Sequence, residues 1–105
     1  MGQTEILETL KKLKSLYNAE GVKIIGLFGS YAQNNADIHS DIDIAYTLDH
    51  SKFSQKYHDG FSKILKIQAI KEELEQALHS KVDFISLDSS NHTFTEHIKK
   101  EMIYV

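Results

Sequence analysis

The chain has 105 residues, of which 41% are hydrophobic, with a formal net charge of −3 at pH 7 and no cysteine. This length has room for one compact domain, so we expect a single domain over residues 1–105 that a homo-oligomer or a partner would help to cover. The acidic balance, with Lys as the only cationic residue besides His, argues against direct nucleic-acid binding. The lack of cysteine, of a leader pattern and of any apolar run near the roughly 18 residues of a membrane span predicts a soluble, cytoplasmic protein.

The first third of the chain predicts a helix, a strand and a short helical turn. A helix is expected from about Thr4 to Glu20, because apolar residues recur there at three- and four-residue spacing. These residues are Ile6, Leu7, Leu10, Leu13 and Leu16 or Tyr17. Val22 to Phe28 is a dense apolar run with β-branched residues, ended by Gly29, and predicts a buried strand. A helical turn is expected from Ser30 to about Asn34.

The middle of the chain predicts a strand, a loop and a long helix. Asp41 to Thr47 reads as a second strand, whereas Leu48 to His58 is polar without clear periodicity and is interpreted as a mobile loop. A long helix follows, with Asp59 as its N-terminal cap. Its apolar residues are Phe61, Ile64, Leu65, Ile67, Ile70, Leu74, Ala77 and Leu78.

The last quarter predicts a third strand from Lys81 to Ser86 and a last helix from about Ser90 to Lys100. Phe94 and Ile98 should share one face of that helix. The apolar end, residues 102–105, could form an edge strand or contact a partner. The order of elements predicts an α/β or α+β fold, a small mixed sheet flanked by helices.

Two carboxylates on the second predicted strand are candidate metal ligands. Asp41 and Asp43 are two residues apart, so their side chains project to the same face of the strand. Ile42 and Ile44 should then face the core. Neighbouring carboxylates repel each other unless they share a cation, and oxygen-only ligands suit Mg²⁺ or Mn²⁺.

A third carboxylate, Asp83, lies between Val82 and Phe84 in the third predicted strand, where an unpaired charge is costly. If that strand lies beside the second one, three carboxylates converge, as two-metal phosphoryl transfer requires. The alternative is that Asp88 is the functional acid and Asp83 merely pairs with a lysine.

The pair Gly29-Ser30 is a candidate phosphate-binding turn. Glycine allows close approach of the backbone, and the turn that follows offers free amides and the Ser30 hydroxyl to a phosphate. Ser40 is interpreted as positioning the turn before Asp41, because no residue near it suggests a base that would make it a nucleophile.

Together these residues resemble the signature of the minimal nucleotidyltransferases (MNT), small antitoxin-type members of the DNA polymerase beta-like superfamily. The signature is Gly-Ser-X-Ala-Arg-Gly, a short spacer, Ser-Asp-X-Asp and an Asp in a later strand. The chain matches it at Gly29, Ser30, Ala32, Ser40, Asp41 and Asp43, with Asp83 in a suitable context. The resemblance covers nearly the whole chain.

The resemblance implies a polymerase beta-like core that transfers AMP from ATP to a tyrosine of a HEPN-domain toxin and so silences the toxin. It implies Mg²⁺ or Mn²⁺ as cofactor. Its catalytic and metal-binding residues would be Asp41, Asp43 and Asp83. Its nucleotide-binding residues would be Gly29, Ser30 and Ser40.

Two departures from the signature keep a second hypothesis open. Gln33 replaces the Arg of the family, and Asn34 replaces its second Gly. These changes affect the support of the phosphate-binding turn, so the alternative is a catalytically degenerate module that neutralises its partner by binding alone. Modification of a small molecule ranks last, since related antibiotic nucleotidyltransferases carry an additional helical domain.

Overall fold

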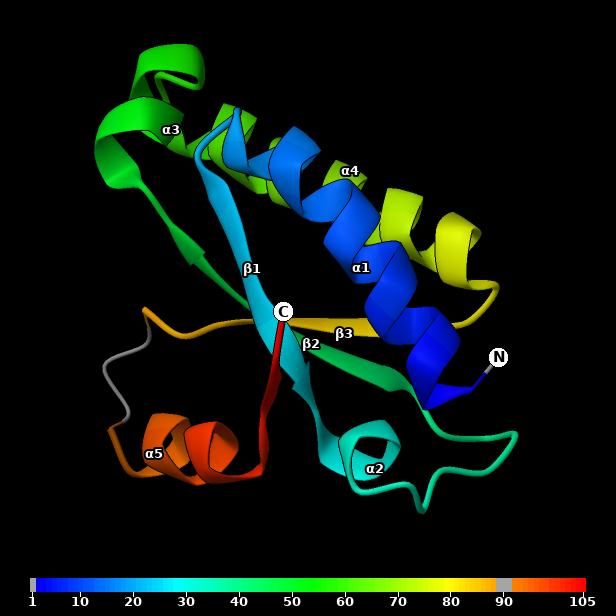
Figure 1. The fold of residues 1–105 in the computed structure, drawn as a ribbon. Helices are drawn as coiled ribbons and strands as arrows, with labels where there is room; N and C mark the ends of the chain where they lie inside the picture. Colours follow the sequence, from blue (N-terminus) through cyan, green and yellow to red (C-terminus); the bar gives the residue numbers. More distant parts are fainter. Residues whose placement is uncertain (1, 89–91) are drawn as a thin grey trace.

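The computed structural model describes residues 2–88 and 92–105 and contains a mixed sheet with helices on both sides (Figure 1). The elements are, in order, α1 (Gln3–Asn18), β1 (Val22–Phe28), α2 (Gly29–Ala32), β2 (Ile42–Leu48), α3 (His50–Lys56), α4 (Gly60–Leu78), β3 (Val82–Ser86), α5 (His92–Glu101) and β4 (Ile103–Tyr104). The predicted fold class is confirmed. Within the described residues, no helix combines the length and apolarity needed to cross a membrane.

The four strands are ordered β3-β2-β1-β4. β1 runs antiparallel to both β2 and β4, whereas β2 and β3 are parallel. Helices α1 and α4 lie on one side of this sheet, and α5 lies on the other (Figure 1). The short α2 follows β1 directly, and its Tyr31 and Ala32 pack against the core on the α1 side. The connection between the parallel strands is formed by α3 and α4, so the second and third predicted strands are neighbours in space.

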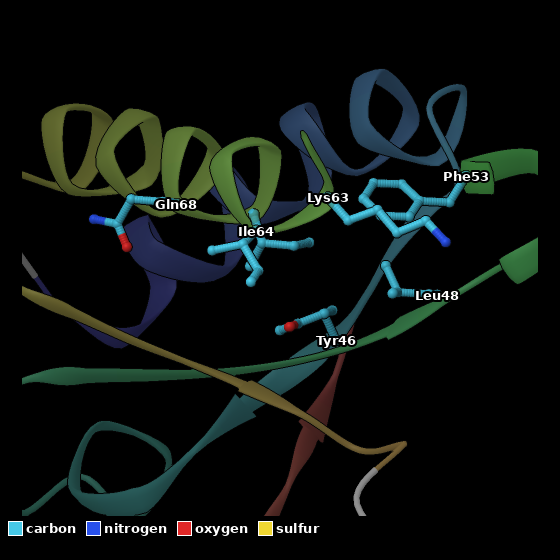
Figure 2. Close-up of a pocket in the computed structure, with 7 residues that line it drawn as sticks. Tyr46, Leu48, Phe53, Lys63, Ile64 and Gln68 are labelled. Atoms are coloured by element: carbon cyan, nitrogen blue, oxygen red, sulfur yellow. The ribbon is translucent and has the colours of Figure 1, made fainter. Parts of the chain in front are cut away.

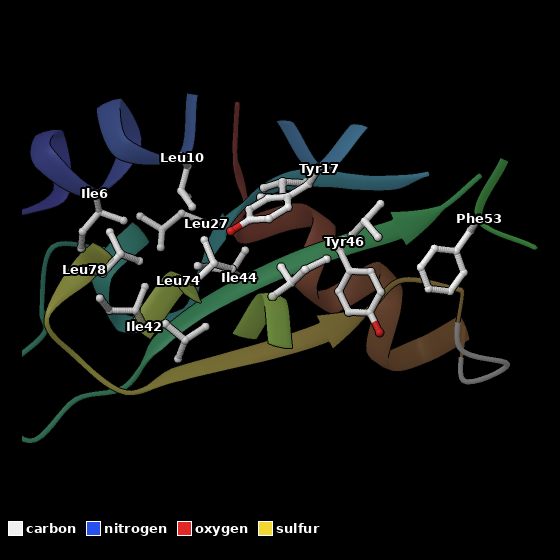
Figure 3. Packing of buried hydrophobic residues seen from close by; sticks show 14 residues of the cluster. Ile6, Leu10, Tyr17, Leu27, Ile42, Ile44, Tyr46, Phe53, Leu74 and Leu78 are labelled. Atoms are coloured by element: carbon white, nitrogen blue, oxygen red, sulfur yellow. The ribbon is translucent and has the colours of Figure 1, made fainter. Parts of the chain in front are cut away.

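The larger of two cores lies between the sheet and the helices α1 and α4 (Figure 3). Strand β2 contributes Ile42 and Ile44 to this core. Both are almost fully buried, as the alternation of side chains along the strand predicted. A smaller core on the opposite face contains Phe28, Ala45, Ile98 and Met102. Asp43 alternates with Ile42 and Ile44, so it projects to the face of the smaller core.

The predicted mobile loop between Leu48 and His58 is wrong, because residues 50–56 form α3. Asp49 caps this helix by accepting a hydrogen bond from the Lys52 amide at 3.2 Å. Phe53 is its single buried residue, and it packs so tightly against the corner after α1 that a Cβ on Gly21 would lie 2.6 Å from the Phe53 amide nitrogen. One anchoring residue in a seven-residue helix leaves no periodicity to detect in the sequence.

The long helix α4 begins as predicted, with the Asp59 side chain accepting a hydrogen bond from the Ser62 amide at 2.7 Å. Its C-terminal half is buried through Ile70, Leu74 and Leu78. The apolar residues of its first two turns are exposed instead: Phe61 by 73%, Ile64 by 69% and Leu65 by 53%. Periodicity therefore located the helix but not the extent of its buried face.

The chain ends in the edge strand β4, one of the two predicted alternatives. It pairs with β1, and a Cβ on Gly26 of β1 would overlap the Ile103 carbonyl and lie 2.8 Å from Cγ of Met102, the residue before β4. In α5, Ile98 is buried while Phe94 is 46% exposed, so their predicted shared face is only partly buried. The predicted start of this helix at Ser90 lies outside the described residues.

Candidate active site

Asp43 and Asp83 face each other across the parallel pairing of β2 and β3, where they are register partners. The pKa of the Asp43 carboxyl is raised to about 6, first by burial and then by the charges of Asp83 and Asp41 and a hydrogen bond with Asp83. Two of the three predicted carboxylates thus form a close pair.

Asp41 lies just before β2 and is exposed to solvent. Its charge contributes to the raised pKa of Asp43. In residues 2–88 and 92–105, no group of three or more His, Asp or Glu side chains is arranged to hold a metal ion. The donor set itself fits a hard divalent cation, because it offers only carboxylate oxygens and its mutual repulsion would be relieved by positive charge.

Gly29 lies directly against the Asp43 carboxylate. Its φ of 74° is in the left-handed region, and a Cβ built on it would overlap Asp43 Oδ2 and lie 3.0 Å from Asp43 Cγ. Only glycine satisfies both constraints. The predicted phosphate-binding turn and the predicted metal-binding strand therefore meet at a single point.

Ser40 helps to shape the loop that leads to Asp41. Its Oγ accepts a hydrogen bond from the Asp37 amide at 3.0 Å, and the Asp37 carboxylate in turn accepts one from the His39 amide at 2.8 Å. These bonds agree with the interpretation of Ser40 as a turn-forming residue. Ser30 is half-buried in α2, and its carbonyl accepts a hydrogen bond from the Asn35 amide at 3.0 Å.

The two departures from the family signature lie at and just after the end of α2. Asn34 has a φ of 60°, the left-handed conformation that its family glycine would adopt easily and that Asn tolerates better than most residues. Gln33 is exposed at the end of α2. Sequence reasoning missed Gln3, whose Nε2 donates hydrogen bonds to the carbonyls of Tyr31 at 2.9 Å and Ala32 at 3.0 Å.

The alternative acid, Asp88, is engaged elsewhere. Its Oδ2 accepts a hydrogen bond from the Leu48 amide at 3.0 Å and lies 3.7 Å from His50 Nε2, at the opposite end of β2 from Asp43. Among the described residues, no lysine forms an ion pair with Asp83. The structure thus favours Asp83 over Asp88 as the third acid.

A groove of about 320 Å³ lies between α4 and the sheet (Figure 2). Its walls are mainly apolar and include Tyr46, Phe53 and Ile64. Tyr46 belongs to the larger core, on the opposite face of β2 from Asp43, so this groove is separate from the carboxylates.

The family model described as "Polymerase beta, Nucleotidyltransferase" matches residues 8–105. Among curated relatives, the Methanocaldococcus jannaschii protein named "Putative protein adenylyltransferase MJ1379" is 36% identical over 104 residues, covering 97% of this chain and 96% of that protein. The "Protein adenylyltransferase MntA" of Thermococcus cleftensis is 28% identical over 105 residues, covering 92% and 96%.

Solved structures share the fold. A minimal nucleotidyltransferase superposes with a TM-score of 0.78 at 22% identity, covering 100% of this chain and 97% of that one. A toxin–antitoxin complex with AMP-PNP contains a chain that superposes with a TM-score of 0.63 at 24% identity, covering 99% of this chain and 72% of that one. With the signature residues brought together at Gly29 and Asp43, the family model and the 36% identical relative show that the chain belongs to the polymerase beta nucleotidyltransferase family.

Proposed function

We propose that this nucleotidyltransferase is a metal-dependent protein adenylyltransferase that moves AMP from ATP to a tyrosine of a HEPN toxin and thereby acts as an antitoxin. The observation that carries the proposal is the contact of the Gly29 turn with Asp43 and, through Asp43, with Asp83. It is supported by the relatives named as protein adenylyltransferases. It is also supported by a fold neighbour, a Shewanella oneidensis MNT antitoxin in complex with a tri-AMPylated HEPN toxin, which superposes with a TM-score of 0.59 at 24% identity.

In this proposal the acceptor oxygen forms a bond to the α-phosphorus of ATP while the bond from that phosphorus to the pyrophosphate oxygen breaks. Asp83 orients the acceptor hydroxyl and accepts its proton. Its exposure to solvent suits a residue that must meet an incoming substrate. A divalent Mg²⁺ or Mn²⁺ ion held by Asp41, Asp43 and Asp83 would neutralise phosphate charge and polarise the reacting groups.

The nucleotide's phosphates would bind at the start of α2. Gly29 leaves room for the phosphate chain beside Asp43, and the Ser30 hydroxyl donates a hydrogen bond to a phosphate oxygen. Ser40 fixes the loop that presents Asp41. The absence of Arg makes these backbone and hydroxyl groups more important, since no guanidinium supplies a fork of donors to phosphate.

The second candidate function is neutralisation of the toxin by binding alone. It is favoured by the lack, among the described residues, of a three-ligand group arranged to hold a metal ion and by the exposed apolar residues at the start of α4, Phe61, Ile64 and Leu65. Together with the neighbouring groove (Figure 2), they form apolar surface of the kind that a protein partner covers. This surface serves either mechanism.

Co-expression with the partner toxin, followed by its intact mass, tests the proposal. Wild-type protein should add AMP to the toxin, and Asp43→Asn should add none. Asp59→Asn is the matched control, because it makes the same chemical change at the cap of α4, where Asn also caps well. An unmodified toxin beside the wild type would refute the transferase proposal, and continued neutralisation by Asp43→Asn would favour the binding module.

A further inference from the structure

The side chain of Gln3, in the first turn of α1, is joined to the end of α2 by two hydrogen bonds. Nε2 donates to the Tyr31 carbonyl at 2.9 Å and to the Ala32 carbonyl at 3.0 Å. An amide NH₂ group has two hydrogens, so one nitrogen satisfies both carbonyls. More than a quarter of the chain separates the bonded groups in sequence, and the bonds tie the two helices together.

Helix α2 has particular need of such a link. It spans only four residues, so its carbonyls depend on amides from the residues that follow: those of Gly29 and Ser30 accept from Gln33 at 3.1 Å and Asn35 at 3.0 Å, and that of Tyr31 accepts a longer bond from Asn34 at 3.4 Å. Gln33 has already left helical geometry, with φ −90° and ψ 0°, so the end of the helix, at Tyr31 and Ala32, gains most from a further donor. The same helix begins at Gly29, which must stay against Asp43 without a side chain between them. A small rotation of α2 would change that contact and displace the Ser30 hydroxyl.

We propose that Gln3 is a positioning residue for the nucleotide site: its amide anchors the end of α2 and so holds Gly29 and Ser30 in place for the phosphates. This inference rests on the proposed nucleotide transfer at that site. It explains how the turn is supported in a chain that carries Gln33 in place of the family arginine.

Two substitutions separate this role from a contribution to the stability of α1. Gln3→Glu keeps the size of the side chain but places carboxylate oxygens against two carbonyl oxygens, so the link is lost. Glu is nevertheless favourable in the first turn of a helix, whereas Lys is unfavourable there. Gln3→Lys restores donors to the two carbonyls, so it should lose stability yet keep the link.

The experiment measures the KM for ATP, the kcat for AMP transfer and the free energy of unfolding in urea. Gln3→Glu should raise the KM for ATP about fivefold or more without loss of stability, as expected when a link worth about 1 kcal/mol is removed. Gln3→Lys should retain the wild-type KM. Thr4→Glu, which adds the same charge at an exposed neighbouring position, should change neither constant. An unchanged KM in Gln3→Glu would overturn the inference.

A readout that needs no transfer separates failure of this inference from failure of the proposed function. The amides of Gln33 and Asn35 donate to the carbonyls of Gly29 at 3.1 Å and Ser30 at 3.0 Å, so their hydrogen exchange reports the order of the turn. Exchange at both should accelerate in Gln3→Glu and not in Thr4→Glu, whether or not the wild type modifies a toxin. Unchanged exchange would refute the role of Gln3, and accelerated exchange with an inactive wild type would refute only the proposed transfer.

Discussion

Gly29 and Asp43 touch at the junction of a turn and a strand, and the contact leaves no space for a side chain on Gly29. Gly29→Ala should therefore abolish transfer and destabilise the fold by about 1–3 kcal/mol, through the left-handed backbone and the overlap with the carboxylate. Activity assays and urea unfolding measure both effects. Gly60→Ala is the control, because nothing lies within 4 Å of a Cβ there, and it should leave activity unchanged.

The charge of Asp43 should reduce the stability of the metal-free protein at neutral and alkaline pH. Its pKa is raised from 3.8 to about 6, so protonation favours the folded state. That stabilisation is complete below pH 3.8 and is lost as the pH rises through about 6. Asp43→Asn should therefore be more stable than the wild type at pH 8, with a smaller difference at pH 5. Urea unfolding without divalent ions measures this, and a difference that grows towards acid pH would contradict it.

Mg²⁺ should stabilise the wild type by relieving the repulsion between Asp43 and Asp83. A ligand that binds only the folded state raises the thermal midpoint with concentration. We expect the thermal midpoint to rise with Mg²⁺ at pH 8 and a chelator to reverse the rise. The rise should be smaller towards pH 5, because protonated carboxyls bind metal poorly. Asp43→Asn should show no such rise. Equal shifts in the wild type and Asp43→Asn would place the metal elsewhere.

The exposed start of α4 should contribute to binding of the toxin. Phe61→Ser and Leu65→Ser remove apolar surface that is 73% and 53% exposed, so they should weaken the complex while leaving the free energy of unfolding almost unchanged. Tyr104→Ser, at the 59% exposed edge strand β4, is the comparison. Titration calorimetry with the toxin measures the affinity. If both α4 variants bind like the wild type, the surface has another role.

The sequence predicted those parts of the fold that depend on local signals. Val22–Phe28 forms the strand expected from its apolar run, and Asp59 caps α4. The mobile-loop prediction failed for α3 because that helix depends on one cap, Asp49, and one buried ring, Phe53, which only the tertiary structure brings into place. The exposure of Phe61 likewise depends on where α4 crosses the sheet, which periodicity does not contain.

The candidate site also combines features that local sequence signals predict with features that only the tertiary structure shows. The alternation along the strand predicted that Asp43 faces away from Ile42 and Ile44, and the context of Asp83 predicted a third acid, but only strand order and register show that Asp43 and Asp83 are partners. No local pattern could indicate the link from Gln3 to Tyr31, since a glutamine near the start of a helix is usually solvated. Contacts between distant segments require the fold itself.

Because the acid pair depends on the pairing of β2 with β3, only a completely folded chain can be active. The Asp43–Asp83 pair exists only when two parallel strands, separated in sequence by α3 and α4, meet in the correct register. A slip of one residue would turn Asp83 to the buried side of the sheet and disassemble the pair. A compact chain without the correct β2–β3 register would hold neither acid in position. Misfolded copies would therefore be inactive, and would not transfer nucleotides to the wrong acceptors.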